Sequence, residues 1–262
     1  MYISSRNNDI IKHIRKIKTN SRTRRKEGLF FAEGRRLISE TPPELLSQVI
    51  VAEDFKPKDT WADKRLERLL KDFEGIVTVS DQVFSEISET SHSQGIAALV
   101  RCPVYKPSDL LGDVPLLLVL ENIQDPGNLG TMIRTSLGAG ATGIVMTEGC
   151  VDIFSPKVVR ATMGAIYRMP FIVVSDIGSL SDKLPQGIRL FAASLNGKSS
   201  YDSFDYRQGC GFLIGNEGRG LSEKALEAAD QEMLIPMEGG LESLNAAMAA
   251  GILLYEAHRQ RQ

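Results

Sequence analysis

The first place in this sequence where side chains could do chemistry is a polar segment at residues 121–134, which follows an apolar run and leads into a stretch suited to a helix. We expect Asn128 or Thr131 to cap that helix and Arg134 to lie about one turn inside it. Residues 135–141 carry no charge, which favours a buried helix. A buried guanidinium needs anionic or carbonyl partners, and a phosphate or ribose oxygen would suit its donors. An ordinary surface Arg is the simpler alternative.

A second candidate segment covers residues 214–222, where another apolar run ends in a turn rich in glycine. Its glycine and polar positions are Gly215, Asn216, Glu217, Gly218 and Gly220. The glycines allow close backbone approach or a positive φ, and Ser222 is a good N-cap for a following helix. The spacing matches neither the dinucleotide fingerprint nor a P-loop, which argues against NAD and ATP. Taken alone, a plain glycine-rich turn explains it.

A third candidate segment, residues 235–251, is a glycine-bearing loop that leads into a helix rich in small residues. So many small side chains indicate that another backbone packs closely on this helix. Ser243 and Asn245 are suited to cap it, or to hold a neighbouring side chain such as Arg134 in place.

The elements around these segments predict an α/β fold for the second half of the chain. Strands are expected at residues 116–120, 143–147, 171–174, 190–193, 211–214 and 233–235, with helical segments between most of them. Apolar strands that alternate with helices predict a mainly parallel sheet, whose ligands bind beyond the carboxyl ends of the strands. The loops that follow strands are therefore the expected site.

The first hundred residues predict a separate, small α/β domain. Strands are expected at residues 29–33, 49–51, 76–79 and 96–100, and helices at 9–18, 59–73 and 81–87. A stretch with two prolines follows and resembles a linker. We expect a first domain at 1–101, a linker at 102–114 and a second domain at 115–262.

Charge is unevenly distributed, although the net charge is only −2. Residues 1–40 hold eleven Lys and Arg against four Asp and Glu. Such a positive region would attract phosphates and release their counterions, although a solvated helix face explains it equally well. The candidate RNA-binding residues are Arg22, Arg24, Arg25, Lys26, Arg35 and Arg36.

Composition limits the remaining function classes. With 42% hydrophobic and 24% charged residues, the sequence is typical of a globular protein. Its polar start and short apolar runs predict neither a signal peptide nor a membrane span, so we expect a cytosolic protein. The three cysteines are scattered, which argues against a disulfide framework and against a zinc or other metal site.

The three candidate segments, in this order, resemble the motifs of the SpoU/TrmH branch of the SPOUT methyltransferases, and the resemblance covers residues 115–262. Residues 1–100 are more loosely similar to the L30/L7Ae-type RNA-binding domain that precedes the catalytic domain in many members, notably at residues 24–34 and 94–98. The resemblance implies a trefoil-knotted catalytic domain, S-adenosylmethionine as the cofactor, methylation of a ribose 2′-hydroxyl and a homodimer. Ribosomal RNA is a more natural substrate than tRNA for such an arrangement.

The resemblance also implies the site residues. The catalytic set becomes Asn128, Arg134, Glu217, Ser243 and Asn245. The cofactor-binding set becomes Ser194, Leu195, Gly215, Asn216, Gly218, Ile235 and Leu244. Family proposals make the Arg a general base, but a charged guanidinium has no acceptor, so Arg134 is equally suited to stabilise a developing alkoxide or to anchor a phosphate.

Two other functions fit some of these features. A non-catalytic RNA-binding protein would use the basic first domain and employ the second only for dimerisation, and binding of S-adenosylmethionine would separate it from the enzyme. The second alternative is a nicotinamide-dependent oxidoreductase, but this sequence lacks the glycine fingerprint and the suitably placed acid of such enzymes.

Overall fold

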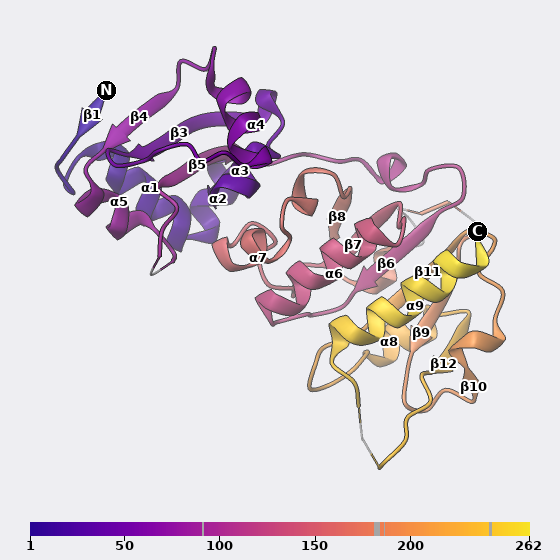
Figure 1. The fold of residues 1–262 in the computed structure, drawn as a ribbon. Coiled ribbons are helices and arrows are strands. Elements are labelled where there is room, and N and C mark those ends of the chain that lie inside the picture. The colour runs from indigo at the N-terminus through magenta and orange to yellow at the C-terminus, as the bar shows by residue number, and fades with distance from the viewer. Residues whose placement is uncertain (91, 181–183, 186, 241–242) are drawn as a thin grey trace. The chain divides into compact units, whose positions relative to one another are not determined.

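The computed structural model describes all residues except 91, 181–183, 186 and 241–242. The chain forms two compact units, and Figure 1 shows the elements of each. The first consists of Met1–Pro103 and Phe154–Tyr167, and the second of Val104–Ile153 and Arg168–Gln262. Among the described residues no helix is both long and apolar enough to cross a membrane.

Five strands form the sheet of the first unit, in the order β1-β4-β3-β5-β2. They are β1 (Tyr2–Ile3), β2 (Leu29–Glu33), β3 (Leu46–Ala52), β4 (Ile76–Val79) and β5 (Ile96–Arg101). β3 pairs with β4 in parallel and with β5 in antiparallel register. All of β5 except its last residue is buried, as expected for a strand inside a sheet.

Most helices of the first unit begin at a residue whose side chain caps the helix. The helices of this unit are α1 (Asp9–Thr19), α2 (Ser21–Glu27), α3 (Arg35–Ser39), α4 (Trp61–Leu70) and α5 (Asp81–Ile87), with a 3₁₀ turn at Pro43–Leu45. The Asn8 side chain accepts the N–H of Ile10 and so caps α1. Ile11, Ile14 and Ile17 recur at helical spacing and are fully buried, so the helix packs its apolar stripe against the core.

A stretch from the middle of the chain completes the first unit. It contains α7 (Pro156–Ala161) and a 3₁₀ turn at Ala165–Tyr167. The Phe154 ring stacks on Phe30 of β2 with 4.9 Å between ring centroids. The sequence pattern places this stretch in the second domain, because it divides the chain into consecutive segments. The contact between Phe154 and Phe30 joins residues that are distant in the sequence.

Seven strands form the sheet of the second unit, in the order β10-β12-β9-β11-β6-β7-β8. They are β6 (Leu116–Leu120), β7 (Gly143–Thr147), β8 (Phe171–Val174), β9 (Arg189–Ala193), β10 (Ser199–Ser200), β11 (Cys210–Ile214) and β12 (Gln231–Leu234). Every pairing described in this sheet is parallel. Each residue of β6, β7 and β11 is buried, which confirms the mainly parallel sheet predicted from their apolar runs.

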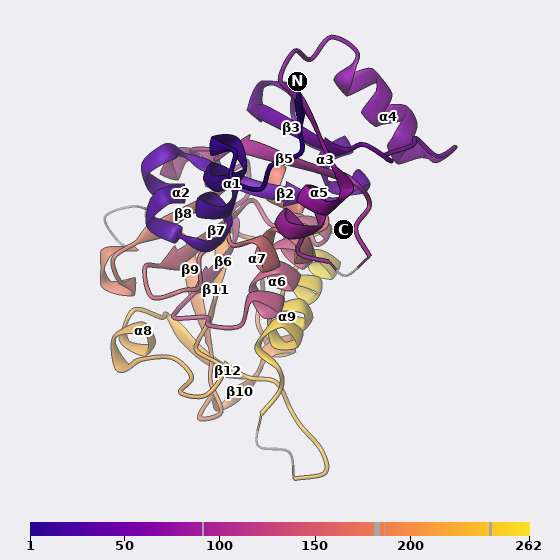
Figure 2. The same cartoon turned by 90° about the vertical axis from the view of Figure 1, so that its left-hand side faces the viewer.

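The helices of the second unit are α6 (Pro126–Gly138), α8 (Glu223–Glu227) and α9 (Ala246–Gln260), with 3₁₀ turns at Pro107–Leu110, Ile177–Leu180 and Tyr201–Ser203. α6 and α9 lie side by side in both views (Figures 1 and 2). A Cβ added to Gly138 would lie 3.3 Å from the Tyr255 hydroxyl, and one added to Gly251 would lie 3.6 Å from Thr135. Small residues on both helices thus let them approach closely, as the composition of the third segment predicted for α9.

Candidate active site

The first two candidate segments leave the same edge of the parallel sheet from adjacent strands. β6 and β11 are neighbours in parallel register, and their last residues, Leu120 and Ile214, are partners. The Glu121 N–H donates to the Ile214 carbonyl at 2.9 Å, which continues the pairing by one residue. The loops at 121–125 and 215–222 therefore begin side by side, as expected for ligand-binding loops of a parallel sheet.

Glu217 connects these two loops. Its carboxylate accepts the main-chain N–H groups of Gln124 and Asp125 at 3.2 and 3.1 Å and the side-chain amide of Asn128 at 3.0 Å. Partial burial acts to raise the pKa of Glu217, but the hydrogen bonds from Asn128 and from main-chain N–H groups outweigh it and hold the pKa below its ordinary value. Glu217 is thus a charged acceptor that fixes the start of α6.

The third segment joins this cluster through Asn245. The Asn245 side-chain amide donates to the Asn128 side-chain oxygen at 2.9 Å, and the Asn245 oxygen accepts the N–H groups of Ala247 and Met248. Asn245 therefore caps α9, as predicted, and at the same time contacts the first segment. Its partner is Asn128 and not Arg134, which was the neighbour suggested from sequence.

The start of α6 differs from the prediction. The Asp125 side chain accepts the N–H of Asn128 at 2.7 Å and caps the helix, and Pro126 occupies its first position. The expected cap at Asn128 or Thr131 is therefore wrong. Because the helix begins earlier, Arg134 is its ninth residue and lies more than two turns inside.

Arg134 is exposed, so the prediction of a buried guanidinium is also wrong. The buried positions of α6 are Leu129, Gly130, Met132, Ile133 and Ser136. Arg134 lies on the opposite side with the exposed residues Gly127, Thr131 and Gly138. The uncharged stretch reflects small residues on an open face. Arg134 forms no hydrogen bond or ion pair with any residue that the structure describes.

Arg134 is consequently not part of the hydrogen-bonded cluster of Asn128, Glu217 and Asn245. Six positions along a helix correspond to a rise of roughly 9 Å, so Arg134 lies well along α6 from Asn128. The Arg134 side chain lies on the exposed face of α6, so its donors are accessible to a ligand or another chain.

The candidate cofactor residues at the end of β9 and β12 also lie at this edge. Ala193 and Met233 are partners in the parallel pair, and the Ser194 N–H donates to the Met233 carbonyl at 2.9 Å. Leu195 follows β9, and Ile235 follows β12 directly. Leu195 is 67% exposed, and Ile235 is half-buried, so the edge presents apolar side chains beside main-chain polar groups.

The glycine-rich turn after β11 is closed on itself. Asn216 and Gly220 exchange main-chain hydrogen bonds at 3.0 and 2.9 Å, and the Asn216 side-chain oxygen accepts the N–H of Gly218 at 3.0 Å. A Cβ added to Gly215 would lie 2.2 Å from the carbonyl carbon of Gly220. Only glycine fits at Gly215, which explains its place in the motif.

Two candidates of the third segment remain, Ser243 and Leu244. Leu244 is half-buried just before the cap Asn245, and Ser243 is exposed. Leu241 and Glu242, which belong to the third segment, lie outside the described residues.

Sequence reasoning missed a second carboxylate that supports the site. Glu121 is only 7% exposed and accepts both the N–H and the hydroxyl of Ser222, at 2.8 and 2.7 Å. Ser222 in turn caps α8 through the N–H of Ala225. A charged residue directly after the apolar run 116–120 was the signal for this contact.

Gln124 is a further residue that sequence reasoning missed. Its side-chain amide donates to the carbonyls of Gly149 and Asn122, at 2.6 and 3.2 Å, and so ties the loop after β6 to the loop after β7. A Cβ added to Gly149 would lie 1.8 Å from the Asn122 side-chain oxygen, so the close approach requires glycine there.

The candidate RNA-binding residues divide into exposed and structural ones. Arg22, Arg25 and Lys26 of α2 are exposed. Arg24 is 5% exposed and donates to the carbonyls of Ile17 and Lys18 at 2.6 and 2.8 Å. Its expected contact with RNA is wrong, because its guanidinium satisfies the C-terminal carbonyls of α1 instead.

The two remaining basic candidates lie on α3 in different environments. Arg35 is half-buried and forms an ion pair with Asp63. Arg36 is exposed and forms an ion pair with Glu40 at 3.3 Å. Within the described residues, no three His, Cys, Asp or Glu side chains gather as a group able to hold a metal ion.

Comparison with known families assigns both parts of the chain. Residues 115–255 match the SpoU rRNA Methylase family, and residues 8–98 match the MRM3-like substrate binding domain. The two matched ranges do not overlap.

Individual relatives extend over nearly the whole chain. The 23S rRNA (guanosine(2553)-2'-O)-methyltransferase RlmP of Bacillus subtilis is 33% identical over 97% of this chain and 97% of its own length. The AdoMet-bound rRNA methyltransferase of Sinorhizobium meliloti has a similar structure, with a TM-score of 0.86, 27% identity and coverage of 99% of this chain and 97% of its own. The SpoU methyltransferase AviRb of Streptomyces viridochromogenes, solved with AdoMet, has a TM-score of 0.84 at 26% identity, with 97% and 99% of the two chains covered.

Proposed function

We propose, given that this chain belongs to the SpoU rRNA methylase family, that it transfers the methyl group of S-adenosylmethionine to a ribose 2′-hydroxyl of ribosomal RNA. The observation that carries the proposal is the hydrogen-bonded cluster of Glu217, Asn128 and Asn245, which joins all three candidate segments. The names of the relatives, which include 23S rRNA 2′-O-methyltransferases, support the same reaction.

The residues at the carboxyl edge of the sheet suit S-adenosylmethionine. Leu195 and Ile235 offer apolar surface for an adenine ring, and the main-chain groups around Ser194 and Gly215 offer donors and acceptors for its edge and ribose. Asn216 and Gly218 hold the turn that limits the site, and Leu244 adds apolar surface ahead of α9. Such a mix of apolar walls and a few fixed polar groups is typical of cofactor sites.

S-adenosylmethionine supplies an activated methyl group on a sulfonium, so the protein's main contribution is alignment of the ribose oxygen. Glu217 holds the main chain at Gln124 and Asp125, and Asn128 is held from both sides by Glu217 and Asn245. These residues thereby form a fixed hydrogen-bonded cluster against which a ribose can be oriented. Ser243 is exposed two residues before Asn245 and is available for a contact with the substrate.

Arg134 acts, in this proposal, on the RNA and not on the cluster. Its side chain is exposed on α6, so it is positioned to bind a phosphate or to stabilise the charge that develops on the ribose oxygen. Either role uses the guanidinium as a donor, which agrees with its hydrogen-bonding chemistry.

A homodimer is part of the same proposal. On α9, Met248 and Tyr255 are 60% and 50% exposed at positions that share one face of the helix. The neighbouring α6 exposes Thr131 and Arg134. An apolar face beside small and basic residues is suited to an identical partner. Light scattering on the M248E/Y255E double variant tests it, with a dimer expected for the unchanged chain and a monomer for the variant.

Two measurements on the purified chain test the proposed reaction. Titration calorimetry with S-adenosylmethionine should show binding, and incubation with labelled S-adenosylmethionine and unmodified ribosomal RNA should transfer label to the RNA. Binding of RNA without any binding of S-adenosylmethionine would instead support the non-catalytic RNA-binding protein. Labelling of tRNA alone would identify tRNA, and not ribosomal RNA, as the substrate.

A further inference from the structure

The first unit contains an open groove of about 720 Å³. It is lined by residues of α3 and α4, by the loop after β3 and by the loop before β5. Its volume lies within the range of roughly 300–1,000 Å³ that is usual for ligand sites. The residues that matter below are Arg35, Arg36, Phe55, Lys56, Lys58 and Gln94.

Arg35 and Phe55 form a flat, fixed surface in this groove. The guanidinium carbon of Arg35 lies 4.4 Å from the centroid of the Phe55 ring. Asp63 forms an ion pair with Arg35, and the Lys56 carbonyl accepts from its other terminal nitrogen at 2.8 Å. Because these partners hold the guanidinium, the pair presents a preformed planar surface. Unpaired RNA bases stack on such aromatic and guanidinium planes.

The cations around this surface are suited to phosphates. Arg35 neutralises Asp63, whose side chain is only 1% exposed. Lys56 and Lys58 are exposed cations on the groove, and Arg36 is an exposed cation there that is paired with Glu40. Two acids, Asp54 and Asp81, also line it, and the Asp81 carboxylate accepts the Asp54 N–H at 3.3 Å. Cationic side chains next to a stacking surface are the arrangement that binds single-stranded RNA.

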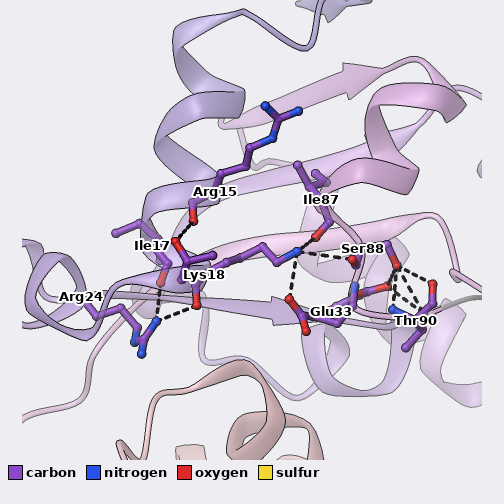
Figure 3. A network of polar contacts seen from close by, with 10 residues as sticks. Arg15, Ile17, Lys18, Arg24, Glu33, Ile87, Ser88 and Thr90 are labelled. Atoms are coloured by element: carbon purple, nitrogen blue, oxygen red, sulfur yellow. Dashed lines mark hydrogen bonds and ion pairs between the residues drawn. The ribbon is translucent and has the colours of Figure 1, made fainter.

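Elsewhere in the first unit, a network of polar contacts surrounds Glu33 at the end of β2 (Figure 3). The Glu33 carboxylate accepts the Ser88 and Thr90 hydroxyls, at 2.5 and 3.0 Å, and the Glu89 N–H at 2.6 Å. Lys18, whose side chain is 9% exposed, forms an ion pair with Glu89 at 2.9 Å. These contacts hold residues 88–90 against Glu33 and Lys18.

Gln94, which lines the groove, contacts the start of α3. Its side-chain oxygen accepts the Arg35 N–H at 2.8 Å. The amide nitrogen of Gln94 is on an exposed residue that lines the groove, so it is available to a base edge. A preformed site of this kind loses little conformational freedom when it binds.

We infer that this groove binds an unpaired nucleotide of the RNA substrate, with the base on the Arg35–Phe55 surface and the flanking phosphates at Lys56, Lys58 and Arg36. The inference rests on the proposed function, because it assumes an RNA substrate. It goes beyond it by naming the part of the first unit that contacts RNA and by requiring that the bound nucleotide be unpaired. The exposed basic residues of α2 are then a secondary surface.

The test compares two charge reversals in the full-length chain. The groove variant is K56E/K58E, and the control variant is R22E/R25E on α2, which changes the same number of charges. Fluorescence anisotropy measures the affinity for a labelled single-stranded RNA dodecamer and for the same strand in a perfect duplex. We expect the unchanged chain to prefer the single strand. K56E/K58E should bind it at least about tenfold more weakly and lower the salt slope by about 1.4, or 0.7 per phosphate contact.

A second variant tests the stacking surface without a change of charge. F55L keeps an apolar side chain in the groove and should weaken single-strand binding about tenfold, because base stacking on an aromatic ring is lost. Duplex binding should change much less. Cross-linking of 4-thiouridine-labelled RNA, followed by mass spectrometry, should locate the contact in the peptides that contain residues 55–58 or 92–94.

The results separate RNA binding at this groove from the proposed methyltransferase function. If K56E/K58E and F55L bind the single strand as the unchanged chain does, or if R22E/R25E alone weakens binding, the groove is not the site. Thermal unfolding, measured on the same samples, shows whether each variant is folded. If the unchanged chain binds neither S-adenosylmethionine nor RNA, the proposed function fails instead.

Discussion

The side-chain amide of Asn128 donates to the Glu217 carboxylate at 3.0 Å, although 89 positions separate the two residues in the chain. Asn128 uses its oxygen at the same time to accept from Asn245 at 2.9 Å. Its amide group is thereby oriented by one acceptor and one donor, which leaves a single orientation that satisfies both. The first segment is consequently held in register with the second and third.

Replacing Asn128 by Asp should remove most activity. The new carboxylate would face Glu217 at hydrogen-bond distance, where the two negative charges repel and the donor is lost. Because a small displacement of a positioning group costs about 100-fold in rate, we expect a loss of methyl transfer of about that size. Steady-state transfer of labelled methyl to RNA measures it.

The matched control for N128D is K224Q, which also lowers the net charge by one, at an exposed residue of the nearby α8. This variant should retain its activity. Equal losses in both variants would show that net charge near the site, and not the Asn128 contact, limits the reaction.

Acid should weaken the contribution of Glu217 to stability. Because hydrogen bonding holds the pKa of Glu217 below its ordinary value, its folded-state contacts are fully present above the pKa of an unfolded glutamate, about 4.3, and are lost as pH falls through the lower folded-state value. The difference in melting temperature between the unchanged chain and E217Q should therefore be constant from about pH 6 to about pH 9 and shrink below about pH 4. Calorimetry over this range tests it, and a difference that changes near neutral pH would contradict the assignment.

Two substitutions at Asn245 should separate its cap from its contact with Asn128. Alanine removes both, and loss of an N-cap costs about 1 kcal/mol. Aspartate keeps an oxygen for the N–H groups of Ala247 and Met248 but cannot donate to Asn128. We expect denaturant unfolding to show a loss of stability in N245A only, and the methyl-transfer assay to show reduced activity in both. Full activity in N245D would mean that Asn245 serves only as a cap.

Arg134 should matter for the reaction and not for folding. Since its side chain is exposed on α6 and has no partner among the described residues, R134A should melt at the temperature of the unchanged chain. Its methyl transfer should fall by about 100-fold, the size of effect seen when one donor to a developing oxyanion is removed. R134K should recover part of the rate if the charge binds a phosphate. A pH–rate profile of all three enzymes is the measurement, and an unchanged rate in R134A would remove Arg134 from the site.

Most of the second unit could be predicted from its sequence because its elements have strong local signals. The apolar runs of β6 and β11 are long enough to mark buried parallel strands, and Asn245 and Ser222 are in cap positions that their residue types favour. The short strands β1 and β10 have only two residues each and no pattern of their own. The trefoil knot that the resemblance implies stays a prediction.

The errors in the site arose where local signals compete or where contacts are distant. Asp125 followed by Pro126 is itself a helix-start signal, and it took precedence over Asn128. Lack of charge around Arg134 was interpreted as burial, whereas it reflects small exposed residues such as Thr131. Arg24 belongs to a basic run, but only the structure shows its guanidinium on the end of α1. The contact of Asn128 with Glu217 depends on the pairing of β6 with β11, which no local pattern encodes.

The proposed function of this chain is methylation of a ribose 2′-hydroxyl in ribosomal RNA. The most direct measurement maps 2′-O-methyl groups, by their resistance to alkaline cleavage, in ribosomal RNA from cells that carry the gene, lack it, or carry it with the N128D substitution. We expect a ribose methyl group that is present with the unchanged gene, absent without the gene and strongly reduced with N128D. Identical 2′-O-methyl maps in all three, or a difference confined to methyl groups on bases, would contradict it.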